Sequence, residues 1–529
     1  MARQGRGVRR WGADRWALVG FLLLAWGLRL PPILDNRFHP DEALYGYWGL
    51  LIGRGRDPWL ASVPVYKPPL LPYLVAGAQA LFGNSDGCLS SDGCRAIGMA
   101  ASAFSVRLTG LAAGLLTVPL VAALAYALYR ERWTALGAAA VVALSPFAIL
   151  FSATAFTDPL MVALGVAACA AAARGRPGWA GVLAGLAVAT KQTGVAWVGL
   201  AAGVQIADYK SQIANRKSRI ANWSSFIGHS SSFIVHFLLV LVLVFAWDRV
   251  RVGQGAEGFW RVGVTGYGGL RLIWPQELWT RLRSWLELGR YVLVSPVANG
   301  VLLLGLPALV WRGIARRRFA RESLADLLFV SFGLIYALFH WLWAFPVWDR
   351  YLLPLVPVLA ILLARILSLL ASAIYRVTSA ARHWSLVIVH WSLFILLLCP
   401  AFNAAHSRYP VGGDHGAYDG IDEVAAFLRD LPEGAVVYQH WLGWHYDYYL
   451  FDAPVYLAYW PTPAWLAQDV RAFGGAEPRY VTFPAWESPG RVARALGGVG
   501  YGLEAVLTTT RRDGARSFTV YRIVPVAGQ

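Results

Sequence analysis

The sequence predicts a mainly α-helical polytopic membrane protein with about nine full membrane spans, a helical hairpin and a small C-terminal extracytoplasmic α/β domain. Of its 529 residues, 57% are hydrophobic and only 15% are charged, and the mean hydropathy is +0.48. Soluble domains of this size need more polar surface. In addition, the Lys and Arg residues that give a net charge of +17 stand in short clusters between apolar segments.

The basic clusters indicate the topology. They lie at residues 1–10, 129–132, 174–178, 215–219, 312–321 and 375–382. Clusters of this kind between apolar segments are typical of cytoplasmic loops. The basic balance therefore points to a lipid bilayer as the surroundings of the chain, and no nucleic acid is expected as a partner.

Nine apolar segments are long enough to cross a bilayer, which takes ~17–25 residues. They lie at residues 15–34, 103–128, 133–152, 158–173, 231–247, 291–311, 324–345, 351–373 and 384–400. The first follows a basic N-terminus and lacks a small-x-small cleavage site, so we expect an uncleaved helix with a cytoplasmic N-terminus.

A tenth apolar stretch, residues 179–207, is interrupted by TKQTG. A single crossing would place the basic cluster at 215–219 outside the cell, together with the clusters that follow it. Two half-length helices that break near Lys191–Gly194 keep every basic loop in the cytoplasm. Irregular backbone at membrane depth is tolerated where protein buries it, so the sequence predicts a hairpin.

The composition changes after residue 400, where charged residues and turns return. IDEVAAFLRDL (421–431) has the pattern of an amphipathic helix, GAVVYQH (434–440) and RYVTFP (479–484) resemble strands, and a closing pair of strands follows. This alternation is typical of an α/β domain. We therefore expect a membrane-embedded domain over 1–400, with 35–100 as its first extracytoplasmic loop, and an extracytoplasmic domain over 401–529.

Two adjacent carboxylates, Asp41 and Glu42, follow the first span in FHPDEALYGYW. As scaffold, they would cap the helix that begins after Pro40, because acidic residues favour helix N-termini. As a site, one carboxylate would be the general base that takes a proton from an acceptor hydroxyl. Neighbouring helical residues point in different directions, so the other would orient a partner or a metal, with His39 as a supporting candidate.

Further charged residues stand at the outer ends of the expected spans. Lys67 precedes a Pro-Pro pair that opens a new helix, where it could snorkel at the membrane surface or bind a phosphate. Arg350, beside Asp349, could anchor a helix or hold a phosphate in bidentate fashion. Asp158 could be an N-cap or a site residue. Lys191, in the hairpin turn, needs a partner such as Asp158 or must reach the interface.

Metal binding is open on the sequence alone. His440 and His445 stand in the aromatic cluster QHWLGWHYDYYLF (439–451), where packing or carbohydrate stacking competes with metal ligation. The sequence identifies no cofactor with certainty and leaves the need for a metal undecided, since Asp41, Glu42 and Asp158 could gather a divalent cation.

Five segments together resemble the polytopic glycosyltransferases of the C-type fold, and in particular the dolichyl-phosphate-mannose protein mannosyltransferase and lipid A aminoarabinose transferase superfamily. They are HPDEALYGYW (39–48), YKPPLLPYL (66–74), TDPLM (157–161), GLAVATKQTG (185–194) and RYLLPLVPVLAIL (350–362). The resemblance covers roughly residues 15–375.

The resemblance implies an inverting transferase that takes a sugar from a polyprenyl-phosphate donor on the extracytoplasmic side. The acceptor could be a protein, a glycolipid or a polysaccharide. Asp41 matches the catalytic acid of the family, with Glu42 beside it, and Asp158 matches the second acidic position. Lys67 matches the donor-phosphate lysine, and Arg350 a phosphate-contacting arginine.

Two other classes remain open. A transporter or flippase for lipid-linked sugars would also be polytopic, although repeated halves are then expected and the sequence shows none. A non-catalytic assembly protein would tolerate loss of the acidic residues, whereas the HPDE, KPP and TDP segments are all intact.

Overall fold

The computed structural model describes residues 11–83, 92–215, 220–266, 271–315, 320–378 and 382–526. It divides into two compact units, which we call the membrane unit and the sheet unit. The membrane unit comprises Met1–Ile33, Asp57–Leu74 and Arg107–Gly412. The sheet unit comprises Leu34–Arg56, Val75–Val106 and Gly413–Gln529. The sequence predicts a different division, with a boundary at residue 400 between a membrane-embedded and an extracytoplasmic domain, and that boundary stays a prediction.

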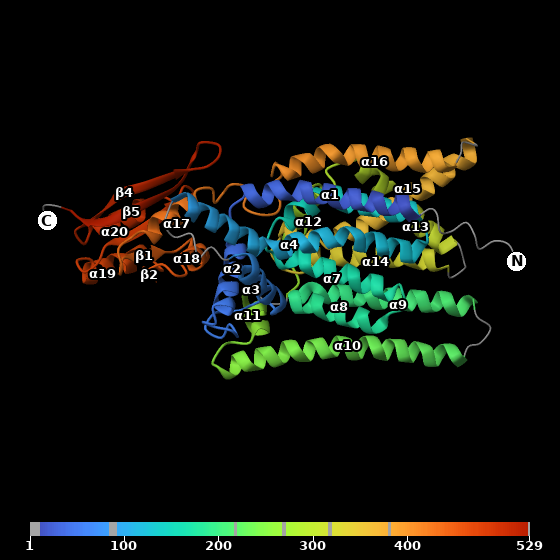
Figure 1. Ribbon diagram of the computed structural model, residues 1–529, viewed down its shortest axis with the longest axis horizontal. Coiled ribbons are helices and arrows are strands. Elements are labelled where there is room, and N and C mark those ends of the chain that lie inside the picture. The colour runs from blue at the N-terminus through green and yellow to red at the C-terminus, as the bar shows by residue number, and fades with distance from the viewer. Residues whose placement is uncertain are drawn as a thin grey trace. The chain divides into compact units, whose positions relative to one another are not determined.

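The membrane unit is built from helices (Figure 1). In chain order the helices up to the hairpin are α1 (Trp11–Asp35), α3 (Leu70–Phe82), α4 (Asp92–Tyr129), α5 (Arg132–Leu144), α6 (Pro146–Ser152), α7 (Thr157–Ala172), α8 (Pro177–Thr190), η2 (Gln192–Gly194) and α9 (Val195–Asn215). Those that follow are α10 (Ile220–Gly253), α11 (Phe259–Gly266), α12 (Glu277–Gly289), α13 (Pro296–Ala315), α14 (Arg321–Leu342), η3 (Asp349–Leu352), α15 (Leu355–Thr378) and α16 (Arg382–Ala405). The unit boundaries fall within α3 and α4.

Among the described residues, seven helices are long and apolar enough to cross a membrane, or eight if the bent pair α5 and α6 is one span. The multi-span class is therefore confirmed. The span expected at residues 158–173 corresponds to α7, a shorter helix of 16 residues.

The break expected near Lys191–Gly194 is present. Helix α8 ends at Thr190, η2 makes one short turn, and α9 runs back to pack against α7 and α8. A Cβ on Gly194 would lie 2.4 Å from the carbonyl oxygen of Ala187. Only glycine permits so close an approach of two backbone segments, so this residue fixes the sharpness of the turn.

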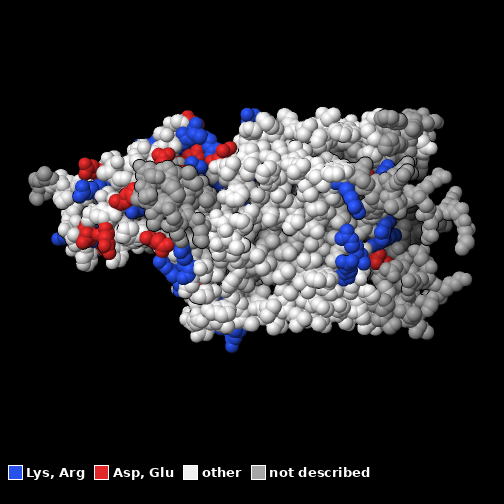
Figure 2. All heavy atoms as spheres, in the orientation of Figure 1, with Lys and Arg blue, Asp and Glu red and all other residues white. Residues whose placement is uncertain are grey.

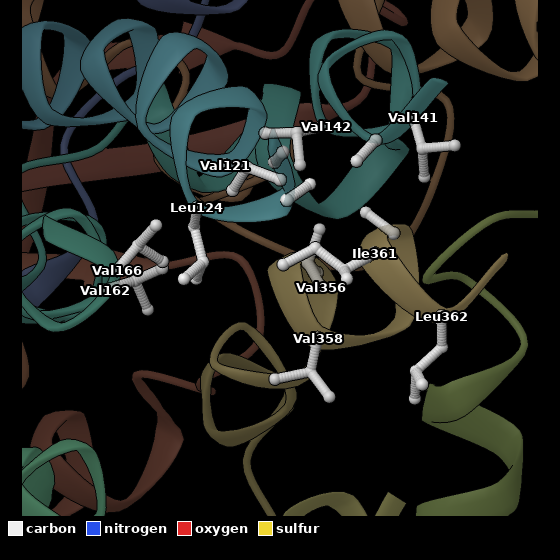
Figure 3. Packing of buried hydrophobic residues seen from close by; sticks show 14 of the residues in the cluster. Val121, Leu124, Val141, Val142, Val162, Val166, Val356, Val358, Ile361 and Leu362 are labelled. Carbon is white, nitrogen blue, oxygen red and sulfur yellow. The ribbon is translucent and has the colours of Figure 1, made fainter. Parts of the chain in front are cut away.

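Buried Val, Leu and Ile side chains from α4, α5, α7 and α15 meet in the core of the membrane unit (Figure 3). Glycine lets the helices approach closely: a Cβ on Gly165 would lie 2.2 Å from the ring of Trp197. In Figure 2, Lys and Arg side chains gather near one end of the bundle, whereas its length carries almost no charge on the face in view.

The sheet unit carries the expected α/β fold. Its elements are α2 (Pro40–Gly53), α17 (Ile421–Arg429), β1 (Val436–Gln439), α18 (Gly443–Tyr449), β2 (Tyr456–Tyr459), α19 (Pro463–Phe473), β3 (Arg479–Pro484), α20 (Gly490–Gly497), β4 (Tyr501–Thr510) and β5 (Arg516–Pro525). The strand order is β2-β1-β3-β5-β4. Strand β1 pairs in parallel with β2 and β3, and β5 pairs antiparallel with β3 and β4. The closing pair of strands is therefore confirmed.

The structure describes the side chains of two of the cysteines. Cys169 is free and buried, and Cys399 is free and exposed. Cys88 and the side chain of Cys94, which could close a disulfide in the polar stretch NSDGCLSSDGC, lie outside the described residues.

The contact between Gly165 and Trp197 can be tested by substitution. Gly165→Ala places a methyl group against a buried indole, so we expect it to lower the stability by about 1–3 kcal/mol and to lower the thermal midpoint of the detergent-solubilised protein. Gly27→Ala is the matched control, because a Cβ there meets no atom within 4 Å. Equal midpoints for the two variants would contradict this packing.

Candidate functional site

The start of α2 holds the predicted carboxylate pair in a capping box. His39 is the N-cap residue, with φ −67° and ψ 150°. Its Nδ1 accepts the backbone N–H of Asp41 at 3.2 Å, and its own backbone N–H donates to Oε2 of Glu42 at 3.0 Å. Because Nδ1 accepts, the proton of the neutral imidazole is on Nε2. Pro40 occupies the first turn, where its missing N–H costs nothing.

The capping box distinguishes the two carboxylates. Glu42 is fully buried and one of its oxygens closes the cap. Asp41 is only partly buried, so its carboxylate is the more accessible of the two. Glu42 therefore has the structural role of a cap, and Asp41 is left as the candidate for the general base.

The segment that precedes α2 is fixed by His445. The Nε2–H of this histidine donates to the carbonyl oxygen of Phe38 at 2.8 Å. The ring of Tyr418 stacks on the imidazole with centroids 4.5 Å apart. Burial lowers the pKa of His445 to about 4, so the side chain is neutral at physiological pH. His445 thus has a structural role.

His440 is also engaged in packing. Its ring lies 4.5 Å from that of Trp460, centroid to centroid, and its Nδ1 lies 2.7 Å from the carbonyl oxygen of Trp460. Within the described part of the chain, no three His, Cys, Asp or Glu side chains come together as metal ligands. Of the alternatives that the sequence left open for the two histidines, the structure favours packing.

In the membrane unit, Asp158 and Lys191 form a buried ion pair. Nζ of Lys191 lies 2.7 Å from Oδ1 of Asp158, and the two side chains are 3% and 2% exposed. Asp158 lies in the first turn of α7, where the helix dipole favours a negative charge. Lys191 is the C-cap residue of α8. The partner that the sequence left undecided for Lys191 is therefore Asp158.

Lys67 lies in the loop between Asp57 and Pro69 and is 4% exposed. Its Nζ is 5.3 Å from the ring centroid of Tyr66. From the hairpin turn, Nε2 of Gln192 donates to the carbonyl oxygen of Tyr66 at 2.8 Å. The backbone immediately before Lys67 is thus tied to the turn that follows Lys191.

The same loop is held from a second side by Arg251, which is fully buried in the last turn of α10. Its Nε donates to the carbonyl oxygen of Leu60 at 3.0 Å, and its Nη2 to that of Val63 at 3.5 Å. Asp248 lies one turn earlier and pairs with the guanidinium at 3.0 Å. Arg251 therefore fixes the main chain of the loop that carries Lys67.

Arg350 and Asp349 lie in η3. The guanidinium carbon of Arg350 is 4.3 Å from the ring centroid of Trp348 and 5.3 Å from that of Phe156. Asp349 accepts the backbone N–H of Arg350 at 2.7 Å and that of Gly412 at 2.8 Å. These bonds give Asp349 a structural role as a local cap.

A cavity of about 580 Å³ opens between α9, α11 and α14. Its polar lining residues are Lys67, Lys191, Gln192, Thr193, Ser331, Tyr336, His340 and Tyr351. The remaining lining residues are Val195, Ala196, Gly199, Leu200, Trp260, Gly263, Val264, Leu328, Phe332, Ile335, Phe339 and Phe345. The lining positions along α14, from Leu328 to His340, recur every three or four residues and extend over roughly 18 Å.

Lys191 and Tyr351 gather with His340 at one end of this stripe. Nζ of Lys191 is 4.6 Å from the ring centroid of Tyr351, and the rings of Tyr351 and His340 are 5.2 Å apart. Leu328, at the other end, faces Gly203 of α9. The cavity thus runs from a cationic end to an apolar end. Arg350 is next in sequence to a lining residue but is not itself part of the lining.

Sequence reasoning missed several of these residues. His340 could have been found, because an ionisable residue within an apolar span is a functional candidate by default. Tyr336 and Tyr351 carry no comparable signal. Arg251 stands in a segment that looks like an ordinary basic helix end.

The chain is similar to known glycosyltransferases. The model of the dolichyl-phosphate-mannose-protein mannosyltransferase family matches residues 61–250. This segment contains Lys67, Asp158 and Lys191, whereas Asp41 and Arg350 lie outside it. No curated protein sequence matches the chain.

The fold is similar to that of two crystal structures. One is ArnT from Cupriavidus metallidurans bound to undecaprenyl phosphate, with a TM-score of 0.61 and 14% identity. The other is the same protein in the apo state, with a TM-score of 0.62 and 13% identity. Each match covers 96% of this chain and 98% of the ArnT chain. Together with the family match, they confirm the resemblance predicted from the sequence and the polytopic fold.

The buried ion pair predicts a double-mutant result. Lys191→Met leaves the carboxylate of Asp158 buried without its cation, which should cost about 3–5 kcal/mol. Adding Asp158→Leu removes the uncompensated charge and should restore part of the thermal midpoint. Arg56→Met is the control: its ion pair with Asp452 is about half exposed and contributes at most about 1 kcal/mol. An additive double variant would argue against the pair.

The sheet unit should respond to pH through two groups of opposite sign. Burial lowers the pKa of His445 from 6.5 to about 4 and raises that of Asp447 from 3.8 to about 6. Between pH 4 and 6.5 the unfolded chain binds a proton at His445 that the folded chain does not, so this contribution to stability falls as pH falls. Between pH 3.8 and 6 the folded chain holds a proton on Asp447 that the unfolded chain releases, so this contribution falls as pH rises.

The two contributions, each about 3 kcal/mol, oppose each other in the wild type. We therefore expect Asp447→Asn to lower the thermal midpoint as pH falls from about 6 to about 4.5, and His445→Gln to reverse that slope. Thermal unfolding followed by tryptophan fluorescence measures both. Parallel slopes for the two variants would show that other groups control the pH response.

Proposed function

We propose that this protein is an inverting glycosyltransferase that moves a sugar from a polyprenyl-phosphate donor to an extracytoplasmic acceptor. The observation that carries the proposal is the cavity along α9 and α14, which combines an apolar stripe with two lysines in its lining. A polyprenyl phosphate has the same division: a long apolar chain and one anionic group. The ArnT structure holds undecaprenyl phosphate, and the name of the matching family includes a dolichyl-phosphate sugar.

Lys67 is the proposed phosphate ligand. Lys67 is buried and lines the cavity, and it supplies a cation to the donor phosphate. Lys191 lines the same cavity and pairs with Asp158 at 2.7 Å. Arg350 stacks on Trp348 and Phe156 outside the lining, and its charge would favour the same anion from the position next to the lining residue Tyr351. Cations at the phosphate stabilise the negative charge that develops on it as the glycosidic bond breaks.

The reaction needs one base. The acceptor oxygen attacks the anomeric carbon, the bond from that carbon to the phosphate oxygen breaks, and the lipid phosphate leaves with the bonding electrons. Asp41 takes the proton of the acceptor hydroxyl. Because this is a single displacement, no second carboxylate has to act as a nucleophile. Glu42 closes the cap that orients the start of α2, and Asp158 holds Lys191 in place.

The topology limits the donor. From the basic loops we infer a cytoplasmic N-terminus and an extracytoplasmic sheet unit. Nucleotide sugars remain in the cytoplasm, so a base on the outer side requires a donor that has already crossed the membrane. A lipid-linked sugar meets that requirement.

Asp41→Asn tests the proposed chemistry. We expect it to lower sugar transfer in proteoliposomes by at least about 100-fold while leaving expression and lipid-phosphate binding unchanged. The control is Asp35→Asn, which alters an exposed acid at the end of α1, shortly before α2. Transfer is followed by mass spectrometry of the acceptor fraction, with and without EDTA to test for a divalent cation. Wild-type turnover by Asp41→Asn would refute the base assignment.

Lys67→Met separates donor binding from catalysis. We expect about tenfold weaker binding of undecaprenyl phosphate, measured by the ligand-induced rise in thermal midpoint.

Mass spectrometry of envelope glycans and glycoproteins, with and without the gene, distinguishes a transferase from a flippase. A flippase would change the amount of lipid-linked sugar on each side of the membrane without forming a new glycosidic bond.

A further inference from the structure

The parallel strands of the sheet unit end at a common edge. Strand β1 leads into the segment that holds His445, and β3 leads into Ala485 and Trp486. Because β1 and β3 are parallel neighbours, the segments that follow them meet at the carboxyl end of the strands. Ligands of open α/β sheets bind at this edge. The backbone N–H of Ala485 donates to the carbonyl oxygen of Ser517 at 2.7 Å and so fixes the turn that presents Trp486.

A cluster of aromatic side chains, which we call the aromatic group, lies at the carboxyl ends of β1 and β3. The ring of Tyr418 stacks on His445, and the edge of Trp486 meets Tyr418 with centroids 5.7 Å apart. Phe518 braces Trp486 from the sheet at 6.1 Å. Trp486 is nevertheless 46% exposed, and Tyr418 is only partly buried. Two large aromatic side chains are thus held rigidly while part of their surface stays open.

The aromatic group lies beside the start of α2. His445, on which Tyr418 stacks, donates to the carbonyl oxygen of Phe38, three residues before Asp41. Burial, with the carboxylates of Asp414 and Asp41, raises the pKa of Tyr418 to about 12. The hydroxyl of Tyr418 is therefore protonated at physiological pH and can donate a hydrogen bond.

We propose that Tyr418 and Trp486 form an acceptor subsite beside Asp41, and that this subsite takes a sugar ring of the acceptor. The inference rests on the function proposed above and names the class of acceptor, a glycan or glycolipid. A pyranose presents an apolar C–H face that packs on an aromatic ring, and hydroxyls that pair with a phenol and a carboxylate. Tyr418 then orients the ring whose hydroxyl gives its proton to Asp41.

The placement disfavours a polypeptide acceptor. An extended peptide is commonly bound by adding a strand to the edge of a sheet. The edge strands here are β2 and β4, whereas Tyr418 and Trp486 gather where β1 and β3 end. A platform at the ends of strands suits a compact ring better than an extended chain.

Saturation-transfer NMR on the full chain in nanodiscs tests the subsite without requiring turnover. The probes are methyl hexopyranosides, with a Ser/Thr-rich peptide as the alternative ligand. We expect hexoside binding to weaken about tenfold in Trp486→Ala and about threefold to tenfold in Tyr418→Phe.

The sheet unit provides matched controls. Trp465→Ala and Tyr456→Phe alter aromatic residues of the same unit that are 40% and 70% exposed, and both should bind hexosides like the wild type. Unchanged hexoside binding in Trp486→Ala overturns the subsite, as does a wild-type protein that binds no hexoside. A third outcome also overturns the inference: saturation transfer to the peptide and not to the hexosides, with that transfer lost in Trp486→Ala. It would assign Tyr418 and Trp486 to a protein acceptor.

The subsite and the proposed function fail in different ways. If hexosides bind at Trp486 but no sugar is transferred, the transferase assignment is wrong. If the wild type transfers sugar and Trp486→Ala transfers it with an unchanged KM for the acceptor, the transferase stands and the subsite is wrong. A subsite role predicts a higher acceptor KM in Trp486→Ala with little change in kcat, together with undiminished binding of undecaprenyl phosphate.

Discussion

The buried ion pair between Asp158 and Lys191 is the interaction on which the cavity depends. A backbone that leaves the helical pattern at membrane depth must find its hydrogen bonds within the protein, and a cation there needs a partner. The pair ties the start of α7 to the end of α8. Once that turn is fixed, the side chain of Gln192 can donate to the carbonyl oxygen of Tyr66. Helix α9 then begins at Val195, where its first turns line the cavity.

Much of the fold could be predicted because its signals are local. Apolar length, basic clusters and the TKQTG interruption located the spans and the break, and helix and strand periodicities located the C-terminal α/β part. The side-chain partners were not predictable in the same way. Asp158 and Lys191 are 33 positions apart, and His445 meets Phe38 across 407 positions. Contacts at such separations leave no periodic trace, so Tyr418, whose site depends on them, was missed.

The adjacent carboxylates show how one helix turn can separate two roles. At the start of α2 the capping geometry binds the third helical residue, so Glu42 turns back to His39 and Asp41 does not. The sequence placed both acids at the site but could not distinguish them, since either could have faced the cap. Under the proposed function, the residues for the lipid phosphate belong to the membrane unit and those for the acceptor to the sheet unit, so donor binding and acceptor binding can be assayed separately.

Arg251 holds the loop of Lys67 by main-chain carbonyl oxygens, those of Leu60 and Val63. A clamp of this kind does not sense the identity of the side chains that it holds. The exposed side chains of this loop, such as those of Trp59 and Pro64, can then change while the lysine keeps its place, provided that the arginine and its carboxylate partner remain. Such a loop can change its exposed surface without disturbing the lysine that meets the donor under the proposed function.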